Sequence, residues 1–211
     1  MPAMDAAVVA IASFVTAAPG GAEIVRPAEA GAIAVRDAPG GAVVTELRER
    51  TPYGTPTRLW VRDRRPGWEL VPAADAPGGA GWIADAATRP APRRPRRIVI
   101  DVSASRLTVL GGGRRWSTRV IVGGASSPTP PGTYQVTDSL PGKRFNGVYG
   151  ARILALSAYG SPRRTSRLAI HGYPPAARST TESAGCIRVP GAALQRLTRE
   201  APPGTPVEIR A

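Results

Sequence analysis

The sequence has very little of the residue types that most often carry chemistry. Its 211 residues include one cysteine, one histidine and one lysine, and aromatic side chains make up 5% of them. A single cysteine cannot form an internal disulfide, so the fold is not a disulfide scaffold. One histidine and one cysteine cannot supply a zinc site, so we expect no metal and no other cofactor. The two rare residues, His171 and Cys186, lie close together in the sequence.

Long apolar runs are also missing. The apolar run over residues 6–18 is too short to span a bilayer comfortably. It ends in small residues and resembles the core of a signal peptide cleaved near Ala18, although Asp5 stands where a positive charge is expected. We therefore expect residues 1–22 to be a signal peptide or a disordered N-terminus, with an ordinary helix as the alternative. The protein is expected to be exported to the cell envelope, in the periplasm or the cell wall.

Acidic residues are scarce in the second half of the chain. Residues 1–90 hold 9 Arg and 10 Asp or Glu, a net charge of −1, whereas residues 91–211 hold 18 Arg, one Lys and 5 Asp or Glu, a net charge of +14. A half with this positive charge could bind a nucleic acid, an anionic envelope or an acidic substrate. Alternatively, its arginines form a solvated basic face. Because no zinc-ligand spacing, recognition helix or aromatic RNA platform accompanies the charge, we expect no nucleic acid to bind.

Glycine and proline are plentiful instead, with 24 Gly and 23 Pro, which predicts short elements and many turns. In the first half we expect five short strands, at residues 32–36, 42–47, 57–62, 67–71 and 81–84. This spacing predicts a small barrel. The Gly-Trp-Ile-Ala-Asp ending at residues 81–85, with Trp60 and Trp68 upstream, resembles bacterial SH3-like domains found beside cell-wall enzymes. The predicted domain spans residues 23–87, with its tryptophans in the core or, alternatively, in a ligand groove.

A linker rich in proline and arginine follows, which we place at residues 88–95. Its composition predicts an extended, semi-rigid spacer. The second domain, residues 96–211, is expected to be β-rich, with strands at residues 98–102, 107–110, 116–122, 133–137, 152–157, 167–171 and 207–209. Apolar residues at helical spacing predict a helix over residues 190–201. The fold class is therefore mainly β, with one or two short helices.

The spacing of His171 and Cys186 favours nucleophilic catalysis. A thiol needs a base to become a thiolate near neutral pH, and imidazole suits that role. A lone cysteine is more often a small buried hydrophobe and a lone histidine more often structural. The flanking Gly172 and Gly185, and the rigid proline-rich loop at residues 123–132, favour the catalytic interpretation.

The neighbouring residues suggest further roles. Backbone N–H groups around Gly185 and Cys186 would hold an oxyanion. Because no acidic residue adjoins His171, we expect a backbone carbonyl to orient its imidazole. Arg188 would bind a carboxylate, since guanidinium grips carboxylates bidentately, or it is a structural arginine.

Three blocks of residues 96–210 resemble the YkuD-type catalytic domain of L,D-transpeptidases. They are the Asp-Val-Ser-Ala-Ser-Arg-Leu repeat (101–107), the Ser-Pro-Thr-Pro-Pro-Gly-Thr-Tyr loop (127–134), and Ile-His-Gly (170–172) followed by Ser-Ala-Gly-Cys-Ile-Arg (183–188). The resemblance implies a β-sandwich-like fold and peptidoglycan stem peptides as substrates. In that family the cysteine attacks the carbonyl between the third residue of a tetrapeptide stem and its terminal D-Ala, and the thioester is resolved by an amine.

The resemblance assigns Cys186 as nucleophile, His171 as general acid and base, and Gly185 to the oxyanion hole. It also places Arg188, Ser183 and Gly172 at the substrate. This chain departs from the family pattern in two places. Most members carry a second histidine where this chain has Ala184. The absence of that histidine removes a polar group near the oxyanion or the substrate. Many members have asparagine where it has Arg188.

The sequence therefore predicts an exported, monomeric peptidoglycan L,D-transpeptidase with two domains. Water in place of the amine would make it an L,D-carboxypeptidase. A non-catalytic protein that binds the wall is the alternative of another class, and anionic wall polymers are a further expected partner.

Overall fold

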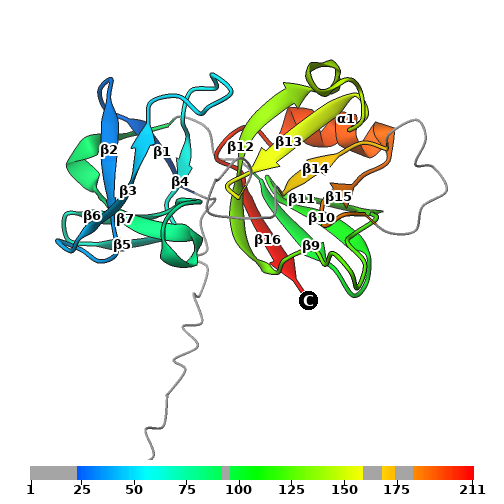
Figure 1. Cartoon of the computed structure of the whole chain (residues 1–211), viewed down its shortest axis with the longest axis horizontal. Coiled ribbons are helices and arrows are strands. Elements are labelled where there is room, and N and C mark those ends of the chain that lie inside the picture. Colours follow the sequence, from blue (N-terminus) through cyan, green and yellow to red (C-terminus); the bar gives the residue numbers. More distant parts are fainter. Residues whose placement is uncertain (1–22, 92–95, 159–167, 174–182) are drawn as a thin grey trace, which may run out of the picture.

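The computed structural model describes residues 23–91, 96–158, 168–173 and 183–211. These residues are mainly β, as the sequence predicts, and their strands form two groups that lie side by side (Figure 1). The predicted signal peptide at residues 1–22 lies outside the described residues. Within the described part of the chain, no helix is both long and apolar enough to cross a membrane.

The first group of strands forms two sheets. Its elements are β1 (Ile24–Pro27), β2 (Ala32–Arg36), β3 (Val43–Arg48), β4 (Leu59–Trp60), β5 (Asp63–Arg65), β6 (Trp68–Pro72), η1 (Pro77–Gly79), β7 (Ala80–Ala84), η2 (Asp85–Ala87) and β8 (Thr88–Pro90). The strand orders are β4-β1-β8 and β3-β2-β7-β6-β5. Apolar side chains from both sheets form one buried cluster, in which Val35, Val71 and Ile83 have no exposed surface.

The main cluster of this first group is aliphatic, and of the three tryptophans that the sequence assigned to the core or to a ligand groove, only Trp82 is buried. Trp82 is buried but lies outside that cluster, because neighbouring residues of a strand point to opposite faces and Ile83 takes the core side. Trp68 is only partly buried. The guanidinium of Arg65 lies 5.1 Å from the centroid of the Trp82 ring, and that of Arg36 lies 5.9 Å from the Trp68 ring.

The predicted linker also needs a correction at its start. Thr88–Pro90 form β8, which pairs with β1 and so belongs to the first group of strands. Proline is tolerated there because β8 is an edge strand. The sequence also missed β1 and β5. Residues 92–95 of the predicted linker lie outside the described residues.

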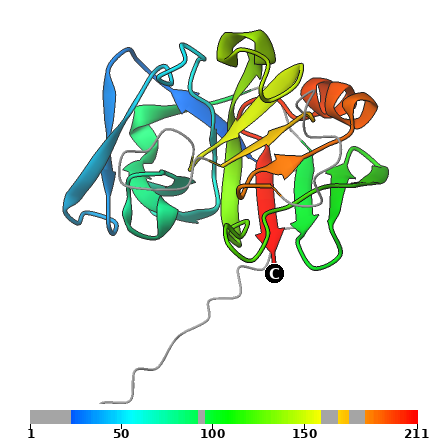
Figure 2. The same ribbon diagram turned by 45° about the vertical axis from the view of Figure 1, so that its right-hand side comes forward.

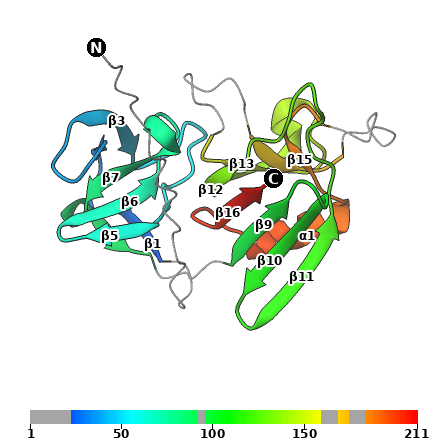
Figure 3. The ribbon, with the colours of Figure 1, turned by 90° about the horizontal axis from the view of Figure 1, so that it is seen from below.

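The second group forms one eight-stranded sheet of order β11-β10-β9-β16-β12-β13-β14-β15. Its elements are β9 (Arg97–Asp101), β10 (Arg106–Gly111), β11 (Arg114–Arg119), β12 (Gly132–Pro141), η3 (Gly142–Phe145), β13 (Arg152–Leu156), β14 (Ala169–His171), β15 (Ile187–Arg188), α1 (Gly191–Glu200) and β16 (Pro206–Arg210). Figure 3 shows β9, β10 and β11 as neighbours at one side of this sheet.

The long strand β12 joins the two halves of that sheet (Figure 2). Residues 132–135 pair with β16, and the part from Val136 to Pro141 pairs with β13. The register shifts between Val136 and Asp138, and a bulge of this kind bends a strand and increases its twist.

The main core of this group contains side chains from both halves of the sheet and from α1. Leu107 and Val109 come from one half, Leu154 and Ile170 come from the other, and all four are fully buried. The helix α1 adds Leu194 and Leu197, the apolar positions that predicted it. Pro190 precedes the helix, and the predicted range of 190–201 exceeds the observed one by a single residue at each end.

The two groups of strands are connected by polar contacts from β12. The buried side-chain amide of Gln135 accepts a hydrogen bond from the Trp60 backbone N–H at 2.6 Å and donates one to the Arg58 carbonyl oxygen at 2.9 Å. The hydroxyl of Thr51 donates to Asp138 at 2.5 Å. Because Gln135 and Asp138 are each 2% exposed, these contacts satisfy groups that would otherwise be buried without partners.

Candidate active site

The strands β14 and β15 bring the two rare residues to one face of the sheet. The strands are parallel, with Ile170 opposite Ile187 and His171 opposite Arg188. Side chains alternate between faces, so Ile170 and Ile187 point into the main core and His171 points to the opposite face. Cys186 directly precedes Ile187 and packs on the small cluster of Leu140, Ile153 and Ala169, and Ala169 shares the face of His171. The pair that the sequence singled out therefore lies on one face of neighbouring strands.

The imidazole of His171 has a defined tautomer. Its Nδ1 lies 2.7 Å from the carbonyl oxygen of Gly172, which can only accept a hydrogen bond. We therefore assign the proton of the neutral ring to Nδ1, which leaves on Nε2 the lone pair that can take a proton from another group. The Gly172 oxygen belongs to the backbone carbonyl that the sequence led us to expect. The Tyr149 backbone makes a second hydrogen bond with the ring.

Burial keeps both groups uncharged. His171 is 4% exposed, and burial lowers the pKa of its imidazole. The charge of Arg188 acts in the same direction, whereas backbone hydrogen bonds with Gly172 and Tyr149 oppose the shift. Burial also raises the pKa of the Cys186 thiol, against smaller opposing effects of the Ala169 backbone and of Arg188. Because both shifts disfavour the charged forms, the resting pair is a thiol and a neutral imidazole at neutral pH.

The turn before Cys186 rests on the proline-rich loop. Gly185 has φ +95°, a conformation that favours glycine, and it is buried. The buried hydroxyl of Thr129 donates to the Gly185 carbonyl oxygen at 2.9 Å and accepts from the Gly123 backbone N–H at 2.8 Å. A Cβ on Gly123 would lie 2.9 Å from the Gly185 Cα, so only glycine allows this approach.

Ser183, Ala184 and Gly172 surround the pair in different ways. The Ser183 side chain is buried, and its hydroxyl donates to the Cys186 carbonyl oxygen, which closes the turn. Ala184 is exposed, so a larger side chain has room there. Gly172 is buried, and a Cβ on it would lie 3.2 Å from Leu194 Cδ2. Contact of Ser183 and Gly172 with a substrate stays a prediction.

The residues that make this site lie within a known family domain. The family model of the YkuD L,D-transpeptidase catalytic domain matches residues 95–209, more than half of the chain. The chain belongs to the L,D-transpeptidase family. No curated protein matches it.

Three solved structures illustrate how far this L,D-transpeptidase domain resembles others. Bd1075 from Bdellovibrio bacteriovorus has 22% identity over 55% of this chain and 48% of that chain, with a TM-score of 0.46. A mutant L,D-transpeptidase from Enterococcus faecium has 18% identity over 55% and 50%, with a TM-score of 0.42. An L,D-transpeptidase from Mycobacterium tuberculosis has 21% identity over 72% and 71%, with a TM-score of 0.45. The chain spans about half the length of the first two proteins.

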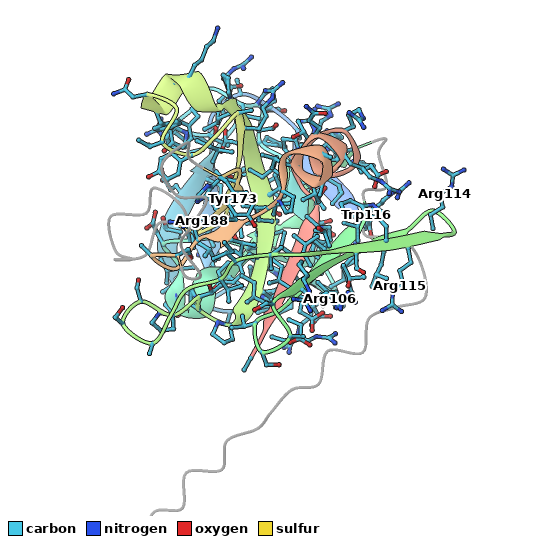
Figure 4. The ribbon with its side chains drawn as sticks, turned by 90° about the vertical axis from the view of Figure 1, so that its right-hand side faces the viewer. Arg106, Arg114, Arg115, Trp116, Tyr173 and Arg188 are labelled. Atoms are coloured by element: carbon cyan, nitrogen blue, oxygen red, sulfur yellow. The ribbon has the colours of Figure 1, made fainter. Side chains whose placement is uncertain are left out.

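Arg188 lies beside the pair in the L,D-transpeptidase domain. It lies opposite His171 in the β14–β15 register and is partly buried. Figure 4 labels its side chain. Its backbone N–H donates to the Ile121 carbonyl oxygen at 2.8 Å, and its carbonyl oxygen accepts from the Ile121 N–H at 3.0 Å. These bonds fix β15 from its outer side and place the guanidinium on the face of His171.

Two residues of the site were not singled out in the sequence. Thr129 lies in a loop that was recognised for its prolines, and only the fold shows that its hydroxyl reaches Gly185. The Tyr149 ring packs edge to face on the His171 imidazole, with centroids 5.0 Å apart and an interplanar angle of 77°. The scarcity of aromatic residues was the one available signal for Tyr149.

Proposed function

We propose that this protein is a peptidoglycan L,D-transpeptidase in which Cys186 is the nucleophile and His171 the general acid and base. The observation that carries the proposal is the shared face of Cys186 and His171, with the imidazole proton held on Nδ1 by the Gly172 carbonyl. Membership of the L,D-transpeptidase family supports stem peptides as the substrate class.

In the first half of the reaction, Nε2 of His171 takes the thiol proton as the sulfur attacks the carbonyl carbon before the terminal D-Ala of a tetrapeptide stem. The carbonyl oxygen becomes an oxyanion, which backbone N–H groups around Gly185 and Cys186 stabilise. The tetrahedral intermediate then collapses, its C–N bond breaks, and His171 returns the proton to the leaving amine of D-Ala. A thioester on Cys186 and free D-Ala result.

In the second half, an amine of another stem attacks the thioester carbonyl. His171 takes the amine proton and returns it to the sulfur as the C–S bond breaks, so the free thiol is regenerated and a cross-link remains. Water in place of the amine releases a tripeptide stem, which is the carboxypeptidase reaction. The two activities share their first half and differ in the acceptor alone.

Arg188 contributes its charge to this scheme. Its guanidinium lies on the face of the catalytic pair and would hold a carboxylate of the stem peptide bidentately. Its positive charge also favours the thiolate over the thiol, because it acts to lower the pKa of Cys186 against the larger effect of burial.

The protein works in the cell envelope, where its exposed arginines meet anionic wall polymers. Arg106, Arg114, Arg115 and Arg119 are all exposed on the β10–β11 hairpin, and Figure 4 shows the first three of them. Arg106 lies directly opposite Arg119 in the ladder, and like charges in such pairs repel each other. A bound polyanion would relieve that repulsion. The first group of strands, which ends with β8, acts as an SH3-like domain in the same envelope setting.

The proposal is tested by incubating the reduced, full-length protein with tetrapeptide muropeptides and identifying the products by mass spectrometry. We expect release of D-Ala and formation of cross-linked dimers, both lost in Cys186→Ala. Tripeptides without dimers would assign the carboxypeptidase activity instead. Failure of the folded protein to release D-Ala, together with pelleting on sacculi that survives Cys186→Ala, would make it a wall-binding protein.

A further inference from the structure

A loop of the first group of strands reaches the face that carries the candidate catalytic pair. The loop spans residues 51–55, and the half-buried side chain of Tyr53 packs on the same small apolar cluster as Cys186. The buried members of this cluster are Leu140, Ile153 and Ala169, which come from β12, β13 and β14. The apolar surface beside the candidate site is therefore built from both groups of strands.

An unbroken series of aromatic contacts leads from Tyr53 to the proposed base. The Tyr53 and Phe145 rings meet edge to face with centroids 6.1 Å apart, and the Phe145 and Tyr149 rings do so at 5.9 Å. The Tyr149 ring then meets the His171 imidazole at 5.0 Å. Edge-to-face packing is a favoured geometry for such rings, so the position of each ring restrains the next.

The position of Tyr53 is fixed by contacts on both sides of its loop. The Thr51 hydroxyl accepts from the backbone N–H groups of Tyr53 at 3.3 Å and Thr55 at 3.2 Å, and donates to the buried Asp138. From η3, Arg144 donates to the Tyr53 carbonyl oxygen at 3.4 Å and lies 5.3 Å from the centroid of its ring. Both anchors, Asp138 and Arg144, belong to the domain that carries the site.

We propose that Tyr53 is a positioning residue for His171. Through Tyr53, the first group of strands holds the rings of Phe145 and Tyr149 in place, and these rings keep water away from the catalytic pair. The inference rests on the proposed function of Cys186 and His171. It gives the first group of strands a direct part in the chemistry, beyond any binding of the cell wall.

Water exclusion matters for this pair because burial is the largest cause of both pKa shifts, downward for His171 and upward for Cys186. Within the part of the chain that the structure describes, the titratable and charged groups on this face beside His171 are Cys186 and Arg188 from the β15 side and Tyr149 from the connection between η3 and β13. None of these three groups is altered by a substitution at Tyr53. Among charged groups, Arg144 loses its contact with the Tyr53 ring but keeps its hydrogen-bond partner, the Tyr53 backbone carbonyl.

The test is the pH–rate profile of Cys186 alkylation by iodoacetamide in the full-length protein, which needs neither a substrate nor the proposed activity. We expect Tyr53→Ala to admit water and shift the apparent pKa of Cys186 downward by roughly half a unit to one unit, which makes alkylation at pH 7 about threefold to tenfold faster. Tyr53→Phe should keep the wild-type profile, because the contact with Phe145 needs the ring and not the hydroxyl.

Gln135→Leu is the matched control, because it removes other contacts between the two groups of strands and leaves the ring series intact. It should keep the wild-type profile as well. Tyr53→Leu replaces Tyr53→Ala if the latter does not fold by circular dichroism. Leucine loses the ring contact with Phe145 but fills part of the space, so a smaller acceleration in the same direction is expected. An unchanged profile in the folded Tyr53 variant, or an equal shift in Gln135→Leu, would overturn the proposal. If a Tyr53 variant loses transpeptidation while its alkylation profile is unshifted, the positioning role of Tyr53 is contradicted. The proposed roles of Cys186 and His171 are not.

Discussion

The Thr129 hydroxyl donates a hydrogen bond of 2.9 Å to the Gly185 carbonyl oxygen, although the two residues are 56 positions apart in the sequence. The same hydroxyl accepts from the Gly123 N–H, so one buried side chain ties the start of the proline-rich loop to the turn before Cys186. The loop is therefore the support on which the proposed nucleophile is held.

Thr129→Val tests that support. Valine has a similar shape but no hydroxyl, so the substitution leaves the Gly123 N–H and the Gly185 carbonyl without this partner in a buried place. We expect a loss of about 1–3 kcal/mol of unfolding free energy. Acylation of Cys186 should slow as well, because the turn is no longer fixed. Urea unfolding and the rate of adduct formation measure the two effects, and wild-type values for both would contradict this role.

Gly185→Ala tests the backbone conformation at the turn. A Cβ there would meet its nearest neighbour, the Pro128 carbonyl oxygen, at an ordinary 3.5 Å, so the cost comes from the positive φ of +95° and not from a clash. We expect about 1–2 kcal/mol of destabilisation.

Gly191→Ala is the control for Gly185→Ala. Gly191 begins α1, has open space around its Cα, and needs no positive φ. Alanine should therefore stabilise the protein by up to about 1 kcal/mol. Equal effects of the two substitutions in thermal denaturation would refute the strain argument.

The pH dependence of stability should reflect both buried groups of the site. Burial lowers the pKa of His171, so the unfolded state binds its proton more readily, and stability falls as the pH drops below about 6.5. Burial raises the pKa of Cys186, so the unfolded state loses its proton first, and stability falls as the pH rises above about 8.5. Melting temperatures against pH should show the acid-side loss reduced in His171→Gln and the alkaline-side loss reduced in Cys186→Ala.

Glu200 at the end of α1 offers a stability test away from the site. Its carboxylate accepts from Trp116 Nε1 at 2.7 Å and pairs with Arg96 at 2.9 Å and Arg196 at 3.0 Å. The side chain is 19% exposed, so water weakens the ion pairs only in part. Glu200→Gln should cost about 1 kcal/mol in urea unfolding. Adduct formation on Cys186 should keep its rate, and a slower rate would show that α1 is coupled to the site.

Much of the second domain was predictable because its signals are local. The apolar runs of β9 and β10, and the spacing of Leu194 and Leu197 in α1, predicted strand and helix positions to within a few residues. The two-residue strand β15 was not predicted, since so short an element carries no periodicity. That strand is nevertheless the one that places Cys186 beside β14.

Other features depend on contacts between distant segments. The three strands missing from the prediction of the first group, β1, β5 and β8, have four, three and three residues. Tyr53 belongs to a loop whose sequence has no strand or helix periodicity, and its neighbour Phe145 lies far away in the sequence. Sequence could name the pair of His171 and Cys186 because each is unique in the chain, but not the residues that enclose it.

Intact-mass measurement after incubation with a carbapenem, which acylates the nucleophile and stays attached, shows whether Cys186 is an activated nucleophile. The folded, reduced protein should gain the mass of one carbapenem, Cys186→Ala should gain none, and His171→Gln should gain it about a hundredfold or more slowly. No added mass on the folded wild type, or an adduct that persists in Cys186→Ala, would contradict the account.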